Sequence, residues 1–454
     1  MAWSDKSHPY RLLLTKQFPL GLETLPIFQP VMQAANRIWN SCAWHSREIF
    51  KQEDRWPTEA ELKTKFKSFA AWKELHSQSA QSVVEEYFEA VSAYRKHREN
   101  GHLEMNPPGF KPKNHLRTVT WKRQGFDVDG STLVLKLSRG KEPIEVVLPE
   151  GWDVVVLPDG TEVKGVPVEV KVKAVIRRRR VENLVLHVTL DLGVVPVYRA
   201  GAVSAYDYNS AVVARAVSNG RLDLFVCREL LSLVQYRNKI IAGFQEKISR
   251  LKEGSRRWKR CLSAKVRVLK RLDRRIRQME HALTKLSAEL DGAEGVAFAV
   301  VGDLTGLRRS ARTGMKGKKA SQKINQMAYD RLRQEQHYKN LTRGIETDTW
   351  TERNTSSTCC LCGARNPAWR RHRGLWVCGR CGLVLQAGLN GAANLLKQYL
   401  FGSCTGRALC LQGSAGLALG REAEPVCASI SKGRLSGTWS SRDGSDGPLR
   451  EAPR

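Results

Sequence analysis

The sequence predicts an α+β protein of several domains, and three observations support this. Apolar residues recur at helical spacing between about 28 and 100, and in short strand-like runs between 115 and 198. Four cysteines stand in two Cys-x2-Cys pairs near residue 370. The chain has 454 residues, which at roughly 100–200 residues per domain is enough for two to four domains.

The charge balance predicts a polyanionic partner. The chain has 75 Lys and Arg against 45 Asp and Glu, a net charge of +30, whereas solubility of a small domain needs only about 2–8 charges. No apolar run approaches the ~18 residues that cross a bilayer, and the charged first residues do not form a signal peptide. We therefore expect a cytoplasmic, nucleoid-associated protein that makes no membrane contact.

The N-terminal half divides at a proline-rich segment. A strand is expected over 9–17, and the pattern from 28 to 105 is helical, with an apolar face that includes Val31, Ile38 and Trp39. Residues 106–113 contain three prolines and cannot form a helix. The strands expected between 115 and 198 suit a small barrel or sandwich.

The C-terminal half opens with three strands, over 202–208, 212–217 and 222–226. A leucine seam predicts a helical hairpin over about 227–290, and the apolar run 296–301 predicts the central strand of a sheet. A basic loop at 308–319, a helix at 321–341 and a strand at 345–351 follow. The Gly- and Ser-rich tail after 402 is predicted to be disordered.

The two cysteine pairs predict a zinc ribbon. Cys359 and Cys362 are followed after 15 residues by Cys378 and Cys381, and four thiolates in two such turns suit tetrahedral Zn²⁺. The set leaves no vacant coordination position, so the ion would be structural. Four unrelated buried cysteines are the alternative interpretation.

Around these cysteines the sequence resembles the TnpB family, the RNA-guided nucleases associated with transposons, and the related compact type V CRISPR effectors. The resemblance covers about residues 8–400. It rests on RNTSSTCCLCG (353–363), WVCGRCGL (376–383), LNGAANLL (389–396), AYDYNSAVV (205–213), VVGDLTGLR (300–308) and the stretch 77–113.

The resemblance implies a β-barrel wedge domain with a helical recognition lobe, joined to an RNase H-like (RuvC) domain that carries a helical-hairpin insertion and a zinc ribbon. The implied boundaries are 1–27 for the first barrel strand, 28–105 for the recognition lobe, 106–200 for the barrel, 201–353 for RuvC with the hairpin at 227–290, 354–386 for the ribbon, 387–401 for the last RuvC helix and 402–454 for the tail.

The resemblance also implies a departure at the nuclease site. RuvC enzymes hold paired Mg²⁺ with three acids, because Mg²⁺ requires hard carboxylate oxygens. Aligned with the family, the first acid is Asp207, but the second and third positions are Gly302 and Gly388. We therefore expect Asp207 to be vestigial and Mg²⁺ not to bind at this site.

Neighbouring acids offer no simple replacement. Asp303 follows Gly302 directly, so on a strand its side chain points to the opposite face. Glu335 and Asp348 are the nearest remote candidates.

The function predicted from these residues is RNA-guided, sequence-specific binding of double-stranded DNA without cleavage, acting by target occlusion, by repression or by recruitment of protein partners. The partners would be a guide RNA and a target duplex with a short flanking motif. Two alternatives remain open: an RNA-guided endonuclease with a rerouted metal site, and a zinc-ribbon RNA-binding scaffold.

Basic residues beside the predicted boundaries and loops are the candidate phosphate contacts. For the run 177–180, between two predicted strands, a solvated edge is the alternative. The candidates are Lys111, Lys113, Arg177, Arg179, Arg308, Arg309 and Lys316.

Overall fold

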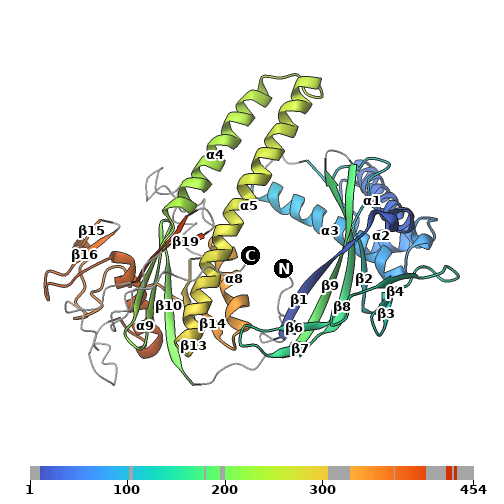
Figure 1. Ribbon diagram of the computed structural model, residues 1–454. Helices are drawn as coiled ribbons and strands as arrows, with labels where there is room; N and C mark the ends of the chain where they lie inside the picture. The colour runs from blue at the N-terminus through green and yellow to red at the C-terminus, as the bar shows by residue number, and fades with distance from the viewer. Residues whose placement is uncertain are drawn as a thin grey trace. The chain divides into compact units, whose positions relative to one another are not determined.

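The computed structural model divides the chain into two compact units, Met1–Val195 and Pro196–Arg454 (Figure 1). It describes residues 11–101, 106–177, 180–194, 200–304, 328–372, 374–404, 426–431 and 434–436. Within this described part, no helix combines the length and the apolar character that a membrane crossing requires.

Three helices of the first unit lie where the apolar periodicity predicts them: α1 (Leu25–Glu53), α2 (Glu59–Phe66) and α3 (Ser77–Glu99). Helix α2 begins with a capping box, in which the Thr58 hydroxyl accepts from the backbone N–H of Glu61 and the Glu61 carboxylate accepts from that of Thr58. The buried face of α1 packs on α3, where the Trp39 ring meets Tyr87 edge-on at 5.1 Å.

The main sheet of the first unit joins the start of the chain to strands far along it. Strand β1 (Arg11–Leu20) pairs antiparallel with β9 (Arg180–Val194), and the order is β1-β9-β8-β2, with β8 at Val166–Arg177 and β2 at Val119–Lys122. Smaller sheets contain β3 (Phe126–Asp129), β4 (Thr132–Leu135) and β5 (Ile144–Val147), and β6 (Val154–Val156) with β7 (Glu162–Lys164).

The proline-rich segment 106–113 is extended and is held along α1 by side-chain hydrogen bonds. The Trp39 indole donates to the carbonyl of Gly109 at 3.1 Å, and the Asn36 amide donates to that of Pro112 at 2.9 Å. Asn40 bonds both the N–H and the carbonyl of Lys111. Because its prolines lack N–H donors, the segment cannot join a helix or a sheet interior, and polar side chains of α1 satisfy its carbonyls instead.

The second unit is built on one mixed sheet with the order β14-β13-β10-β11-β12-β18-β19. Strands β10 (Ala202–Tyr208), β11 (Val212–Val217) and β12 (Leu222–Val226) form an antiparallel meander, and β13 (Val296–Gly302) and β14 (Glu346–Trp350) add in parallel beside β10. This is the RNase H-like arrangement that the resemblance implies. The apolar run at 296–301 lies inside the sheet, as predicted.

Helices cover both faces of this sheet. On one face, α4 (Arg228–Ser249), α5 (Arg256–Ala293) and α8 (Tyr329–Leu341) enclose a core that includes Tyr206, Phe225 and Leu283. Helices α4 and α5 form the predicted hairpin and project well beyond the sheet (Figure 1). On the other face lies α9 (Ala387–Phe401), together with a small sheet of β15 (Arg370–His372), β16 (Leu375–Val377) and β17 (Val384–Leu385).

The tail differs from the expectation of disorder in one place. Strand β18 (Val426–Ser431) pairs parallel with β12 and continues into β19 (Arg434–Ser436), whereas residues 405–425 and 437–454 lie outside the described part. The short β-forming run Val426–Ser431 finds partners in the backbone groups along the edge of β12, which composition alone does not reveal.

A buried ion cluster joins the hairpin to the meander. The Arg215 guanidinium, on β11, lies 2.8 Å from the Asp291 carboxylate of α5 and 2.5 Å from Asp223 of β12, and all three side chains are buried. The Tyr206 hydroxyl donates to the other Asp291 oxygen at 2.8 Å. Each buried acid thus has the guanidinium as its countercharge, and this compensates its removal from water.

Replacing Arg215 is expected to destabilise the second unit strongly. Arg215→Met leaves Asp291 without its buried countercharge and Asp223 with only the half-buried Arg221, and it should cost about 3–5 kcal/mol in the free energy of unfolding, measured by urea denaturation. Arg237→Met is the matched control, because Arg237 pairs with Asp273 at the surface and should cost below about 1 kcal/mol. Equal losses in the two variants would contradict this account.

Candidate acidic site and metal centre

Asp207 and Gly302 lie side by side at the carboxyl ends of two parallel strands. Tyr206 of β10 is in register with Val301 of β13, so the next residues of the two strands, Asp207 and Gly302, are neighbours on the face that α9 covers. In open sheets of this kind, sites form outside the carboxyl ends of parallel strands. The structure thus brings together the first two positions of the predicted site.

Helix α9 closes over Asp207. A Cβ added at Gly391 would overlap an oxygen of the Asp207 carboxylate, so the absence of a side chain at 391 makes room for it. Burial raises the pKa of Asp207 to about 6, against the opposing effects of the neighbouring Asn209 side chain and the positive charge of Arg370 on β15. Burial therefore disfavours the charged form of Asp207 more than the Asn209 side chain and the Arg370 charge favour it.

The space beside Gly302 is filled by the carboxylate of Glu352. A Cβ built on Gly302 would overlap Oε1 of Glu352, which lies two residues beyond the end of β14. The strand has glycine at the position that the resemblance assigns to the second acid. The Glu352 carboxylate, from the loop after β14, lies where a side chain at 302 would begin. Asp207 thus has an acidic neighbour that the sequence analysis did not identify.

The third position is occupied by a helix cap. The Gln386 side chain accepts from the backbone N–H groups of Gly388 and Leu389, at 2.6 and 3.0 Å, and so begins α9. A Cβ at Gly388 would lie 2.8 Å from that Gln386 oxygen and 3.6 Å from the Asn209 amide nitrogen. The position faces the acidic site, but a neutral amide stands where the family has a carboxylate.

The other acids considered from the sequence lie elsewhere. Asp303 lines a cavity of about 220 Å³ together with Tyr208, Tyr329 and Arg333, on the α8 side of the sheet. Glu335 is buried against α5, where the Thr284 hydroxyl donates to it at 3.3 Å. Asp348 is exposed on β14, and its charge raises the pKa of Tyr399, secondary to the burial of that phenol.

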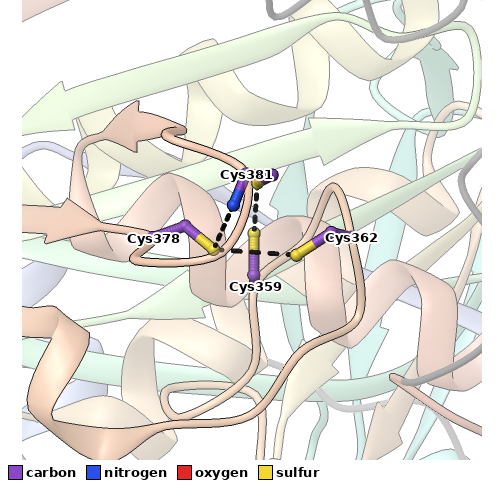
Figure 2. A group of neighbouring side chains, drawn as sticks. All are labelled: Cys359, Cys362, Cys378 and Cys381. Carbon is purple, nitrogen blue, oxygen red and sulfur yellow. Dashed lines mark hydrogen bonds between the residues drawn. The ribbon is translucent and has the colours of Figure 1, made fainter.

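Four cysteine sulfurs converge at the other candidate site. The Sγ atoms of Cys359, Cys362, Cys378 and Cys381 all lie within 4.8 Å of one another and point toward a common centre (Figure 2). Two of the sulfur–sulfur distances are 3.7 Å and 3.6 Å. A tetrahedron with metal–sulfur bonds of about 2.3 Å has edges of about 3.8 Å. The four sulfurs therefore fit a tetrahedral metal ion.

The two cysteine turns have the same backbone geometry. Gly363 and Gly382 have positive φ, +69° and +73°, and their N–H groups each donate at 3.0 Å to the carbonyl of the first cysteine of the pair. Only glycine adopts this conformation readily, which explains why each pair is followed by one. Cys360 points away from the cluster and is buried.

Helix α9 connects the cysteine turns to the acidic site. The Asn390 and Asn394 amides donate to the carbonyl of Thr358 at 2.8 and 2.7 Å, and the Lys397 ammonium donates to that of Cys360. These three side chains are buried on the helix that also places Gly388 and Gly391 at the acidic site.

The predicted phosphate contacts are described only in part. Lys111 and Lys113 are exposed on the segment bound to α1. Arg177 is the last residue of β8, and the structure does not describe its side chain. The other four candidates lie outside the described residues: Arg179, Arg308, Arg309 and Lys316. For these residues nucleic-acid contact stays a prediction.

Glu352 could have been found from the strand register alone. Gly302 pairs with Trp350 in the parallel β13–β14 ladder, so a residue just beyond Trp350 reaches the same sheet edge as Gly302. Glu352 is separated from Gly302 by 50 residues in the chain, so a search for acids adjacent to 302 and 388 in the sequence does not find it.

Comparisons with known proteins agree with this architecture. Residues 329–395 match the Cas12f1-like TNB domain family. A cryo-EM structure of a Cas12f1–sgRNA–target DNA complex has the same fold, with a TM-score of 0.54 and 15% identity over 82% of each chain. A mini-RNA-guided endonuclease, CRISPR-Cas_phi3, matches 87% of this chain and 93% of its own at 9% identity and a TM-score of 0.42. The chain has no match among curated proteins.

The family-model match and the fold shared with the Cas12f1 structure confirm the predicted resemblance to TnpB-like proteins and compact type V effectors. The matched family segment runs from α8 through both cysteine pairs into α9, the region whose motifs carry the resemblance.

At pH values above the pKa of Asp207, neutralising this side chain is expected to stabilise the protein. The ordinary pKa of 3.8 is raised to about 6 in the folded state, so folding favours the protonated carboxyl and stability falls as the pH rises through this window. Without divalent cations, Asp207→Asn should raise the free energy of unfolding at pH 7.5 by about 1–3 kcal/mol and flatten its pH dependence between the two values.

The control is Asp348→Asn on the exposed side of β14, which should change the free energy of unfolding by less than about 0.5 kcal/mol. A loss of stability in Asp207→Asn at pH 7.5 would contradict the prediction, because it would mean that neighbouring groups stabilise the charged carboxylate more than burial destabilises it.

Proposed function

We propose that this protein binds double-stranded DNA at sequences selected by a guide RNA and does not cleave it. The observation that carries this is the replacement of the third acid by Gly388, beside a Gln386 cap. Among the described residues, one group of three or more acidic, histidine or cysteine side chains is close enough to share a metal ion. That group is the cysteine cluster, and it does not include Asp207. Two carboxylates are too few for the paired Mg²⁺ of a RuvC nuclease.

The partners follow from the fold and the charge. One structure that shares this fold is a complex of Cas12f1 with sgRNA and target DNA. The present chain carries a net charge of +30, which suits a large nucleic-acid surface. Base pairing with the guide would read the sequence, and the protein would read backbone shape and a short flanking motif. A bound complex of this kind acts by occluding its target, by repression or by recruiting further proteins.

The cysteine cluster would hold Zn²⁺ in a structural role. Thiolate ligands and tetrahedral geometry select Zn²⁺ among the common ions, and four protein ligands leave no position for a substrate or water. Bound there, the ion fixes the turns that Asn390, Asn394 and Lys397 hold against α9.

A second candidate function is an RNA-guided endonuclease with a rerouted acid, and one observation favours it. Glu352 places a carboxylate at the position of Gly302, next to Asp207, so two of the three acidic positions are filled in space. The geometry makes Glu352, rather than Glu335 or Asp348, the acid on which such an activity would depend.

A cleavage assay distinguishes the two candidates. With guide RNA, matched duplex and Mg²⁺, we expect retention of the duplex in a gel shift and no cut strands, with no difference between the wild type and Asp207→Ala. Specific cuts that vanish in both Asp207→Ala and Glu352→Gln, and persist in Asp348→Asn, would establish the endonuclease in place of the binding protein. RNA binding without retention of matched DNA would indicate the RNA-binding scaffold.

The structure also dictates how a restored site must be built. Gly302→Glu would overlap the Glu352 side chain as it lies, so Glu352 must move or be shortened by Glu352→Ala, and Gly388→Asp needs the end of the flexible Gln386 side chain to shift.

Metal content tests the cysteine site. Cys378→Ser should release the bound ion, leave about zero Zn²⁺ per chain by elemental analysis and destabilise the second unit, since a structural Zn²⁺ contributes directly to folding. Cys360→Ser is the matched control, because Cys360 adjoins Cys359 but lies outside the cluster, and it should retain one Zn²⁺ per chain. Equal Zn²⁺ contents in the two variants would refute this ligand set.

A further inference from the structure

Trp44 and Phe110 are the two most exposed of the four aromatic side chains of the first unit that the structure shows as exposed, ahead of Phe50 and Phe69. Trp44 on α1 is 59% exposed, and Phe110 in the proline-rich segment is 50% exposed. Most of the aromatic surface of this unit is instead buried, as in Trp39, Tyr87 and Trp121. Binding surfaces often contain neighbouring aromatic side chains that are exposed to solvent and do not contribute to the core.

The two exposed rings lie along the same face of α1. Trp44 follows Asn40 by four residues and precedes Arg47 by three, so the three side chains share one helix face. Asn40 bonds the backbone of Lys111, and the Arg47 guanidinium donates to the carbonyl of Pro108 at 3.4 Å. The segment that carries Phe110 therefore runs beside Trp44.

Three cations lie on or beside the segment that carries Phe110. The Arg47 guanidinium lies over the Phe110 ring at 4.5 Å, and the exposed Lys111 and Lys113 follow Phe110 by one and three residues, with the Lys111 ammonium 5.7 Å from the centroid of the Trp39 ring. In the described part of the chain, none of these three side chains forms an ion pair with an acid. We call Trp44, Phe110, Arg47, Lys111 and Lys113 the aromatic platform.

We infer that the aromatic platform binds an unpaired stretch of RNA, with bases stacked on Trp44 and Phe110 and phosphates on Arg47, Lys111 and Lys113. Proteins that bind single strands combine aromatic stacking surfaces with a cationic track for the backbone in this way. The inference deepens the proposed function, on which it rests for the RNA partner, by assigning a contact site to unpaired nucleotides.

Unpaired RNA fits the platform better than duplex DNA does. In a duplex the faces of the bases are stacked on each other and are not open to protein rings, whereas RNA loops and ends expose theirs without prior strand opening. The surplus of positive charge also disfavours a cationic or neutral protein partner relative to a polyanion.

The test measures binding of labelled oligouridine, which is unpaired throughout, to the full chain. Trp44→Leu and Phe110→Leu keep apolar bulk but remove the ring, and each should weaken binding about tenfold. Trp44→Phe should restore most of the affinity. The slope of log K against log salt should stay unchanged in the Leu variants, because no phosphate contact is lost.

The charge variants should behave in the opposite way. Lys111→Gln combined with Lys113→Gln should reduce the magnitude of the salt slope by about 1.4, at about 0.7 per phosphate contact on a single strand. Tyr236→Leu is the matched ring control, since Tyr236 is 53% exposed on α4, outside the platform, and it should leave the affinity for oligouridine unchanged.

The outcomes separate the alternatives. Unchanged affinity of the Leu variants for oligouridine, or an equal loss of affinity for double-stranded RNA, would overturn the inference. The inference would also be overturned if the Leu variants changed the oligomeric state, measured by light scattering, without changing the affinity. That result would indicate that the platform is a protein–protein interface. The assay uses no DNA and no guide, so its failure leaves guided DNA binding untouched. Conversely, loss of guided DNA retention with intact oligouridine binding would remove the proposed function alone.

Discussion

The packing of α9 between the sheet and the cysteine turns is the constraint on which the second unit depends. Toward the sheet, Gly391 lies against the Asp207 carboxylate, and toward the turns, Asn390 and Asn394 donate to backbone carbonyls. These amides are buried; removing Asn394 would take the amide donor from the Thr355 carbonyl, and removing Asn390 would take the acceptor from the Cys360 N–H, each at a cost of about 1–3 kcal/mol. The geometry of the acidic site therefore depends on the cysteine turns, which contact α9 on its other side.

The two glycine substitutions have different structural consequences. At Gly302 the lost side chain is compensated in space by Glu352, which reaches the sheet edge from a loop. A carboxylate on a loop is less fixed than one on the central strand, so even if it can approach a metal ion its position is less preorganised. At Gly388 the space is taken by the Gln386 cap, which stabilises the start of α9. The glycine at 302 thus lies beside an acid from a loop, and the glycine at 388 lies beside the side chain that caps α9.

Most of the fold could be predicted from the sequence, because its signals are local. The β10–β12 meander and the hairpin α4–α5 follow from apolar periodicity, and the cysteine turns follow from spacing and from the glycines that close them. The role of Glu352 could not be read in the same way, since it depends on which strand lies beside β13 and in what register. Strand β18 was missed for the same reason, because its partner β12 lies about 200 residues away. Both are long-range pairings for which composition carries no signal.

The loss of acids also changes how the site meets a nucleic acid. Three carboxylates at one sheet edge repel a phosphate backbone unless divalent cations neutralise them, so a nuclease needs its metal ions for approach as well as for chemistry. Here two of the three positions are glycine, and burial disfavours the charged form of Asp207. With Glu352 beside Gly302, this edge carries two carboxylates where three would repel a phosphate backbone, while Lys and Arg outnumber Asp and Glu over the whole chain. This smaller negative charge suits the proposed binding of DNA without Mg²⁺.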